Sequence, residues 1–319
     1  MTLNLIGNTP MIKIKYRYQN KENYVYAKLE YYNYTGSIKD RIAYYIITKS
    51  KELGLLKDGQ PIVEATSGNT GISFAAIGAL THHPVHIFMP DWASVERIRI
   101  MELYGAHVYL VSKEEGGFRE AIRRSEEYAI KIDGFLPKQF ENSLNTEAHY
   151  LTTAKEIMDS LPSVDTFVSG IGTGGTLIGI AKRLKENNPN IKIVGLEPDK
   201  MPLLSGGKVV QNHKIEGIGD DFIPALVDQS LIDQVVLIND DDAVNMSRLL
   251  AKKLGLGVGI SSGANFLASV LSGGKCVATV FADDFKKYLS TDLAKEIDDN
   301  PKFLSNQIEL IGIEVVNGK

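Results

Sequence analysis

The chain has 319 residues, of which 44% are hydrophobic and 23% are charged, and its formal net charge at pH 7 is −4. These values are typical of a soluble globular protein, and they give no reason to expect nucleic acid or an anionic membrane as a partner. The amino terminus lacks a basic segment before a long apolar run, and no apolar run reaches the length of a membrane span. We therefore expect a cytoplasmic protein. Its single cysteine, Cys276, lies in an apolar run and is expected to be a buried strand residue.

Short apolar runs alternate with helical patterns along the chain. Strands are predicted at residues 24–29, 61–64, 85–88, 107–111, 166–168, 192–196, 234–237 and 276–281. Helices are predicted at residues 42–53, 71–79, 95–104, 118–130, 147–159, 177–185, 241–254 and 264–271. Strands that alternate with helices of this length indicate parallel β-α-β units. We expect two α/β domains, a smaller one over residues 37–145 and a larger one made of 1–36 and 146–319.

The segment Gly170-Ile171-Gly172-Thr173-Gly174-Gly175-Thr176, here called the glycine loop, joins a predicted strand to a predicted helix. Residues without side chains let backbone N–H groups at a helix N-terminus bind an anion. Gly170, Gly172 and Gly175 also fit the spacing of a dinucleotide-binding turn, with Glu197 near the place of a ribose-binding acid. The loop alone therefore does not separate a phosphate site from a dinucleotide site.

A second loop of small polar residues, Thr66-Ser67-Gly68-Asn69-Thr70, precedes another predicted helix and is here called the threonine loop. It could bind an anion in the same way, although Ser67 or Asn69 could simply cap the helix. Two separate anion sites favour a ligand pair with one phosphate and one carboxylate. That pair suits an amino acid together with a phosphorylated cofactor better than it suits a dinucleotide alone.

Lys39 follows Gly36 and Ser37 and lies near the start of a predicted helix. Most lysines are solvated surface charges, but a lysine held at a helix N-terminus and partly desolvated has a lowered pKa. Such an amine can form a Schiff base with an aldehyde. Lys39 is therefore the candidate nucleophile.

Several separated motifs together resemble the cysteine synthase and cystathionine β-synthase family, the fold type II enzymes that use pyridoxal phosphate. The resemblance covers nearly the whole chain, and it disfavours the dinucleotide site. It implies an α/β fold of two open, mostly parallel twisted sheets flanked by helices, like that of the tryptophan synthase β subunit. The motifs are, in order, Leu5-Ile6-Gly7-Asn8-Thr9-Pro10, Lys39, the threonine loop, Met89-Pro90, Gln139-Phe140, the glycine loop, Gly217-Ile218-Gly219 and Gly259-Ile260-Ser261.

The resemblance also implies a role for each matching residue. Lys39 would carry the cofactor and act as general base, Asn69 would bind the ring hydroxyl, and Ser261 would face the ring nitrogen. The cofactor phosphate would be bound by Gly172, Thr173, Gly174, Gly175 and Thr176. The substrate would be bound by Thr66, Ser67, Gly68, Thr70, Gln139 and Gly217. No metal site is expected.

The implied reaction is β-replacement or β-elimination on L-cysteine or a β-activated L-serine, by way of an aminoacrylate. Asp221 is an acid at a position where members like cystathionine β-synthase carry one and acetylserine-using members commonly do not. A carboxylate near the β-carbon can protonate a leaving hydroxide or accept a proton from water. Asp221 therefore favours a hydrogen-sulfide-producing member that converts L-cysteine and water into L-serine and hydrogen sulfide.

Three alternatives stay open. The nearest is a cysteine synthase that uses O-acetylserine and sulfide. Formation of cystathionine or lanthionine would use space near Ala93, where the family usually has methionine. A non-catalytic module that binds the cofactor or docks a partner is a different class, which the retention of Lys39, Asn69, Gln139 and Ser261 argues against. The resemblance also implies a homodimer, and some relatives bind the carboxyl terminus of serine acetyltransferase.

Overall fold

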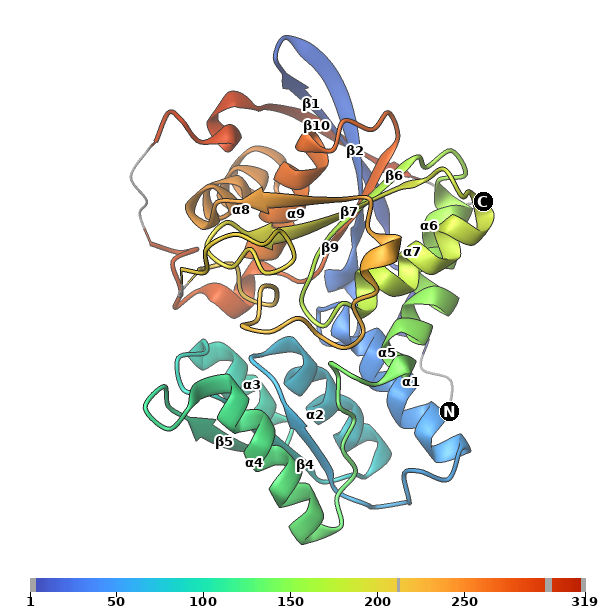
Figure 1. Cartoon of the computed structure of the whole chain (residues 1–319), viewed down its shortest axis with the longest axis vertical. Helices are drawn as coiled ribbons and strands as arrows, with labels where there is room; N and C mark the ends of the chain where they lie inside the picture. The colour runs from blue at the N-terminus through green and yellow to red at the C-terminus, as the bar shows by residue number, and fades with distance from the viewer. Residues whose placement is uncertain (1–3, 211–212, 296–299, 317–319) are drawn as a thin grey trace.

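A computed structural model describes residues 4–210, 213–295 and 300–316 of the chain. These residues form two lobes, each built on its own β-sheet with helices packed against it (Figure 1). The expected α/β class with parallel-rich sheets is thus confirmed. In the described ranges, no helix combines the length and the apolar character needed to cross a membrane.

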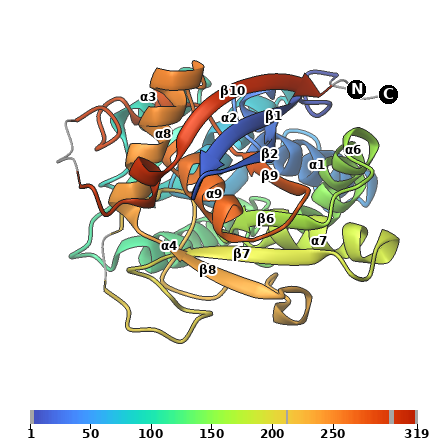
Figure 2. The ribbon, with the colours of Figure 1, turned by 90° about the horizontal axis from the view of Figure 1, so that it is seen from above.

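The larger lobe contains a seven-stranded mixed sheet, seen from above in Figure 2. Five neighbouring strands, β2, β9, β6, β7 and β8, run parallel, while β1 pairs antiparallel with both β2 and β10. From edge to edge the strands are β10 (Glu309–Val316), β1 (Met11–Tyr18), β2 (Lys21–Leu29), β9 (Val277–Phe281), β6 (Thr166–Gly170), β7 (Lys192–Pro198) and β8 (Gln234–Ile238).

Two hydrophobic cores lie on opposite faces of this sheet. Because side chains alternate along a strand, Phe167 and Ile193 pack in one core while their neighbours Val168 and Val194 pack in the other. Burial on both faces explains why these strands are continuous apolar runs. The first core includes α6 (Ala154–Ser160) and α7 (Gly175–Asn187), and the second includes α8 (Asp240–Leu254) and α9 (Ile260–Leu271).

The smaller lobe contains three parallel strands, β3 (Ile62–Ala65), β4 (Val85–Pro90) and β5 (His107–Val111). Its strands are covered by α2 (Asn69–Thr81), α3 (Val95–Leu103) and α4 (Gly117–Ile132). Helix α1 (Lys39–Glu52) packs on both α2 and the short α5 (Ser143–Ala148), and α5 in turn packs on α7 of the larger lobe. These helices connect the two lobes beside the cleft described below.

The structure differs from the sequence-based prediction in three elements. Strands β1 and β10 were not predicted, and together they extend the larger sheet by an antiparallel edge. The helix predicted over residues 147–159 is divided, because a π-helical segment, His149–Thr153, separates α5 from α6. Such segments are rare and occur frequently at functional sites.

Candidate active site

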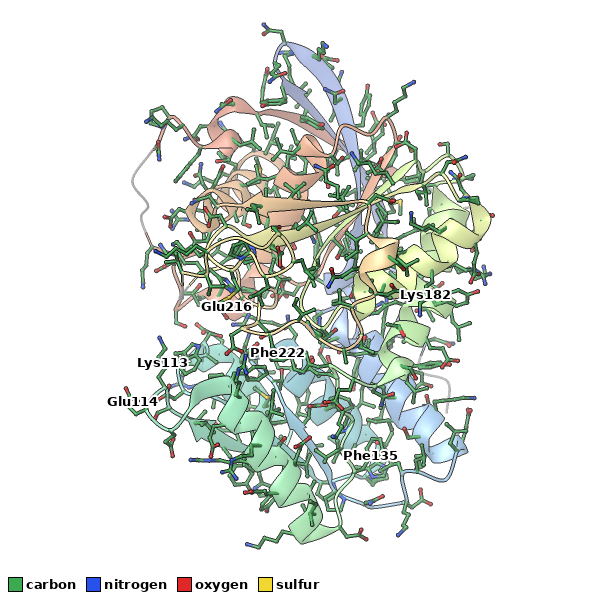
Figure 3. All side chains as sticks on the ribbon, viewed as in Figure 1. Lys113, Glu114, Phe135, Lys182, Glu216 and Phe222 are labelled. Atoms are coloured by element: carbon green, nitrogen blue, oxygen red, sulfur yellow. The ribbon has the colours of Figure 1, made fainter. Side chains whose placement is uncertain are left out.

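A cleft between the lobes collects most of the residues that the sequence singled out. One part, of about 460 Å³, is lined by Lys39, the threonine loop, Arg97, Gln139, Phe140, Thr173, Glu216, Gly217 and Asp220. The adjoining part, of about 520 Å³, is lined by residues that include Gly172, Gly174, Thr176 and Ser261. Lys39, Asn69 and Thr173 line both parts, so the two form one site. Figure 3 shows Glu216 and Phe222 at the boundary between the lobes.

The amine of Lys39 lies in this cleft at the first residue of α1. Burial lowers the pKa of Lys39, while the carboxylates of Asp283 and Asp220 oppose that shift. The sequence predicted a lowered pKa for this residue, and the direction is confirmed. A lower pKa leaves more of the amine neutral, which is the form that attacks a carbonyl or accepts a proton.

The start of α1 is fixed by hydrogen bonds on both sides of Lys39. The backbone N–H of Ile38 donates to the carbonyl of Ala282 at 2.9 Å. The buried carboxylate of Asp40 accepts hydrogen bonds from the backbone N–H of Thr35 at 2.6 Å and from the hydroxyl of Ser73 at 2.6 Å. These bonds attach the base of the Lys39 side chain to β9, α2 and the preceding turn.

The threonine loop ends at the N-terminus of α2. The N-cap residue is Gly68, which has no side chain to accept hydrogen bonds from the first turn. A Cβ atom at Gly68 would lie 2.5 Å from Cδ and Nε of Arg97, so only glycine fits between the loop and α3. Backbone N–H groups at such a helix start, on the wall of a cleft, form a site for an anion such as a carboxylate.

Gln139 lies beside the threonine loop and is held by buried hydrogen bonds. Its side chain accepts a hydrogen bond from the hydroxyl of Thr70 at 2.7 Å and donates to the carbonyl of Ala65 at 2.8 Å. Asn145 donates from Nδ2 to the carbonyl of Gln139 at 2.8 Å and to the hydroxyl of Thr173 at 3.0 Å. Asn145 thus connects the threonine loop to the glycine loop, a role that the sequence analysis did not find.

The glycine loop leads into α7, and close packing leaves no room for a side chain at Gly172, Gly174 or Gly175. Gly174 is the N-cap residue and has a φ of +83°, a conformation that favours glycine. A Cβ atom at Gly172 would lie 2.4 Å from the carbonyl oxygen of Gly217, and one at Gly175 would lie 1.9 Å from Oδ1 of Asn145. The loop therefore presents backbone N–H groups at a helix N-terminus, as phosphate binding requires.

His149 supports the glycine loop from behind. Its Nε2 lies 3.2 Å from the hydroxyl of Thr176, and its Nδ1 lies 2.9 Å from the hydroxyl of Thr153. Burial lowers the pKa of His149 well below its ordinary value, so the ring is neutral and orients Thr176 by hydrogen bonding. His149 is not among the residues predicted from the sequence.

A buried polar group occupies the side of the cleft near Ser261, which lines it from α9. Nδ2 of Asn69 and the hydroxyl of Tyr288 each donate to Oδ2 of Asp283 at 2.8 Å. Within the described ranges, Oδ1 of Asn69 and Oδ1 of Asp283 are buried without a partner. Buried polar atoms are rarely left unpaired, so these atoms indicate a site completed by a ligand.

The two aspartates that follow Gly219 have different surroundings. Asp220 lines the cleft, and burial raises its pKa to about 6, with a further rise from the charge of Asp221 and an opposing effect of Lys39. Asp221 is exposed and is bound by Arg119 of α4, whose Nε lies 2.8 Å from Oδ2. The structure therefore does not bring Asp221 to the cleft in the way that we expected.

These groups fit pyridoxal phosphate, a phosphorylated aldehyde. The glycine loop can bind its phosphate, Lys39 supplies an amine with a lowered pKa for its aldehyde, and the unpaired Asn69 Oδ1 can bond to a polar group of its ring. Residues 2–283 match the family of pyridoxal-phosphate dependent enzymes. The chain belongs to this family, and pyridoxal phosphate is its cofactor.

The chain is similar to cysteine synthases and to a hydrogen sulfide-producing enzyme. A cysteine synthase of Staphylococcus aureus is 41% identical over 296 residues, which cover 91% of this chain and 95% of the relative. Among solved structures, a hydrogen sulfide-producing enzyme from Fusobacterium nucleatum is 50% identical, with 98% of this chain and 96% of that chain covered and a TM-score of 0.93. A cysteine synthase from Entamoeba histolytica is 37% identical, with coverage of 94% and 92% and a TM-score of 0.85. The resemblance inferred from the motifs is confirmed.

Proposed function

We propose that the protein catalyses β-elimination and β-replacement on L-cysteine or a β-activated L-serine, and so interconverts cysteine, serine and sulfide. One observation carries this proposal: the Lys39 amine shares a cleft with two helix N-termini that have glycine at the N-cap. The relatives support it, since they include a hydrogen sulfide-producing enzyme and cysteine synthases. An aspartate-to-asparagine variant of the Fusobacterium enzyme is known in complex with an α-aminoacrylate intermediate.

The glycine loop at α7 would hold the cofactor phosphate through residues 172–176, and Lys39 would hold the aldehyde carbon. When bound, the cofactor withdraws electrons from the α-carbon of the substrate. Ser261 would face the ring nitrogen. A neutral hydroxyl keeps that nitrogen less protonated than a carboxylate would, which favours prompt loss of the β-substituent.

The threonine loop would bind the substrate carboxylate with Thr66, Ser67, Gly68, Thr70 and Gln139, and Gly217 would contact the substrate from the other wall. Nζ of Lys39 would remove the proton from the α-carbon and later return it. The lowered pKa of Lys39 leaves more of the amine neutral and so able to accept that proton.

The proposed domain division places the threonine loop on a smaller domain, residues 37–145, that can close over the substrate. Ion pairs between Arg97 and Glu216 and between Arg119 and Asp221 join this domain to the segment that carries Gly217. Closure over the bound substrate would exclude bulk water from Lys39.

The second candidate is a cysteine synthase that uses O-acetylserine and sulfide, which the identity with the Staphylococcus enzyme favours. Formation of cystathionine or lanthionine has less support, because neither Trp92 nor Ala93 is among the residues that line the two parts of the cleft. The homodimer, the cytoplasmic location and the docking of a serine acetyltransferase carboxyl terminus stay predictions.

The proposal is tested with purified protein saturated with pyridoxal phosphate. We expect a visible absorption band, attachment of the reduced cofactor to Lys39 after borohydride treatment, and turnover of cysteine, serine or O-acetylserine with sulfide measured in each case. Lys39→Ala should abolish both the attachment and the turnover. Lys49→Ala, on the exposed side of the same helix, is the matched control. A colourless wild-type protein without a Lys39 adduct would contradict the proposal.

A further inference from the structure

The carboxylate of Asp220 faces the reactive part of the cleft. It lines the same cavity as Lys39, Thr70, Gln139 and Gly217. It also lines an adjoining pocket with Phe222, Ile223 and Pro224. Within the described parts of the chain, the Asp220 side chain has no hydrogen bond and no ion pair, although its charge interacts with that of Lys39. An unpaired carboxylate in a catalytic cleft is free to exchange a proton with a bound molecule.

The next residue is held on the outside by α4. Arg119 donates from Nε to Oδ2 of Asp221 and from Nη2 to its backbone carbonyl, both at 2.8 Å. The pair is solvent-accessible, since the side chains of Arg119 and Asp221 are 64% and 49% exposed. The two hydrogen bonds direct the Asp221 carboxylate toward solvent and away from Lys39.

Aromatic packing fixes the same segment on the other side of Asp221. The ring of Phe222 contacts that of Phe140 at a centroid distance of 5.0 Å, and Phe140 contacts Phe118 at 5.7 Å. Phe118 and Arg119 are neighbours on α4, so one turn of that helix binds both Asp221 and the aromatic group. With Asp221 and Phe222 held by these contacts, Asp220 is left on the cleft side of the segment.

We propose that Asp220, rather than Asp221, exchanges protons with the β-substituent of the substrate, and that Arg119 holds Asp221 outside the cleft. This assignment rests on the proposed function. In the conversion of cysteine and water to serine and hydrogen sulfide, the Cβ–S bond breaks with its electron pair on sulfur, and the Cβ–O bond forms from a lone pair of water. Asp220 gives its proton to the departing sulfide and regains a proton from the water molecule that adds afterwards, so the charges balance over one turnover and no oxidant or reductant is needed.

If Asp220 exchanges these protons, the effect of replacing it should depend on which group leaves or adds at the β-carbon. Water must lose a proton to add, and the hydroxyl of serine must gain one to leave, so both reactions need an acid–base group at the β-carbon. Acetate leaves without a proton, and sulfide adds as an anion. Asp220 should therefore matter for reactions of water and serine far more than for the reaction of O-acetylserine with sulfide.

The test compares Asp220→Asn with Asp221→Asn in the holoenzyme. For each variant, the rate of sulfide release from L-cysteine in water is divided by the rate of cysteine formation from O-acetylserine and sulfide. General acid–base catalysis contributes roughly 10²–10⁴-fold, so Asp220→Asn should lower this ratio at least about 10²-fold. Asp221→Asn should lower the same ratio by less than about tenfold.

A second readout does not depend on turnover. A carboxyl group whose pKa is raised from 3.8 to about 6 contributes stability that is lost as the pH rises through that interval. The urea midpoint of Asp220→Asn should therefore rise relative to that of the wild type between about pH 4 and pH 7. A ratio lowered by Asp221→Asn and not by Asp220→Asn would overturn the assignment, and so would equal losses in both reactions. A wild-type enzyme inactive in both reactions would instead overturn the proposed function.

Discussion

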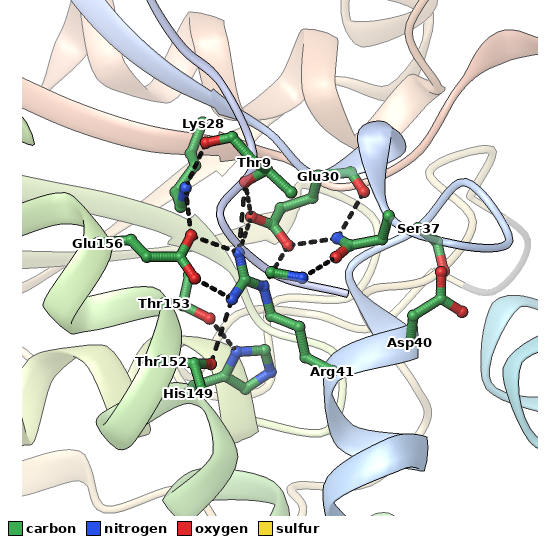
Figure 4. Close-up of polar contacts among 12 residues, drawn as sticks. Thr9, Lys28, Glu30, Ser37, Asp40, Arg41, His149, Thr152, Thr153 and Glu156 are labelled. Atoms are coloured by element: carbon green, nitrogen blue, oxygen red, sulfur yellow. Dashed lines mark hydrogen bonds and ion pairs between the residues drawn. The ribbon is translucent and has the colours of Figure 1, made fainter. Parts of the chain in front are cut away.

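Arg41, which lies two residues after Lys39, forms a buried, bidentate ion pair with Glu30. Nε of Arg41 donates to Oε2 of Glu30 at 2.7 Å, and Nη2 donates to Oε1 at 2.9 Å (Figure 4). The same guanidinium donates to both carboxylate oxygens of Glu156, at 2.7 Å and 2.8 Å. Lys28 adds a further charge contact to Glu156 at 2.6 Å. This network attaches the start of α1, and with it Lys39, to β2 and α6.

Arg41→Met should destabilise the protein strongly. The substitution keeps a similar apolar volume but leaves Glu30 without a cationic partner and Glu156 with Lys28 alone. Removal of one partner from a buried ion pair costs about 3–5 kcal/mol. The free energy of unfolding in urea measures the effect.

Arg17→Met is the matched control for that experiment. Arg17 also bonds to two carboxylates, those of Glu22 and Glu309, but all three side chains are solvent-accessible. Exposed ion pairs contribute about 0–1 kcal/mol. Equal losses for Arg17→Met and Arg41→Met would show that the buried network does not anchor α1 as we infer.

Gly172→Ala should impair cofactor binding. The new methyl group would lie 2.4 Å from the carbonyl oxygen of Gly217, a backbone atom that cannot move without displacing the opposite wall of the cleft. We expect the dissociation constant for pyridoxal phosphate to rise at least about tenfold, and the unfolding free energy to fall by about 1–3 kcal/mol as in other overpacked sites. Titration of the apoprotein with pyridoxal phosphate measures the first quantity.

Gly312→Ala is the corresponding control. Gly312 lies in β10, and a Cβ atom there would have no heavy atom within 4 Å. Cofactor affinity should stay at the wild-type value. If Gly172→Ala bound the cofactor as tightly as Gly312→Ala, the glycine loop would not be the phosphate site.

Asn145→Ala should weaken the binding of both cofactor and substrate. Its Nδ2 donates to the carbonyl of Gln139, beside the threonine loop, and to the hydroxyl of Thr173, in the glycine loop. Loss of the first bond leaves the buried carbonyl of Gln139 unpaired, at a cost of about 1–3 kcal/mol, while the hydroxyl of Thr173 still accepts a hydrogen bond from the backbone N–H of Gly175. We expect a higher dissociation constant for pyridoxal phosphate together with a higher KM for the amino-acid substrate. A variant that changed only one of the two constants would show that Asn145 does not couple the loops.

Much of the site was predictable because short, contiguous segments of sequence determine its backbone conformation. Glycine and small polar residues between an apolar strand and a helix indicate an anion site wherever they occur, and Lys39 stands out by its place at a helix start. The order of these motifs then identified the family. The chemistry of the site therefore follows from short segments of sequence.

The supporting residues could not be predicted, because tertiary packing brings them to the site. Asp283 bonds to Asn69 across 214 positions of sequence, and Asn145 reaches Thr173 across 28. A single polar residue carries no local signal of such a contact. Nor does a sequence show which of two adjacent acids points inward, so Asp221 was selected and Asp220 was not.

Strands β1 and β10 were left out of the sequence-based prediction for two different reasons. The alternation Met11-Ile12-Lys13-Ile14-Lys15-Tyr16 in β1 does fit a strand with one buried face, and it could have been recognised. Strand β10 is an edge strand with exposed Ile311, Ile313 and Val315 and a glycine at its centre, so its pattern is weak.

Glu64 should make the stability of the protein depend on pH between about pH 4.5 and pH 8. Its side chain is buried at the end of β3, and its carboxylate accepts hydrogen bonds from the backbone N–H groups of Ala65 at 2.9 Å and Gln139 at 3.2 Å. Burial raises the pKa of Glu64 from 4.5 to about 8. A carboxyl group with a raised pKa makes its full contribution to stability below its ordinary pKa, here 4.5. That contribution, of about 3–5 kcal/mol, is lost as the pH rises to about 8.

Glu64→Gln should remove this dependence, because an amide does not ionise. The variant loses one hydrogen bond to a backbone N–H group, so we expect it to be about 1 kcal/mol less stable than the wild type near pH 5 and more stable at pH 9. Urea unfolding across that range measures both curves. Glu102→Gln, at an exposed position on α3, should follow the wild-type curve. Parallel curves for the wild type and Glu64→Gln would mean that Glu64 is already ionised in the folded protein at neutral pH.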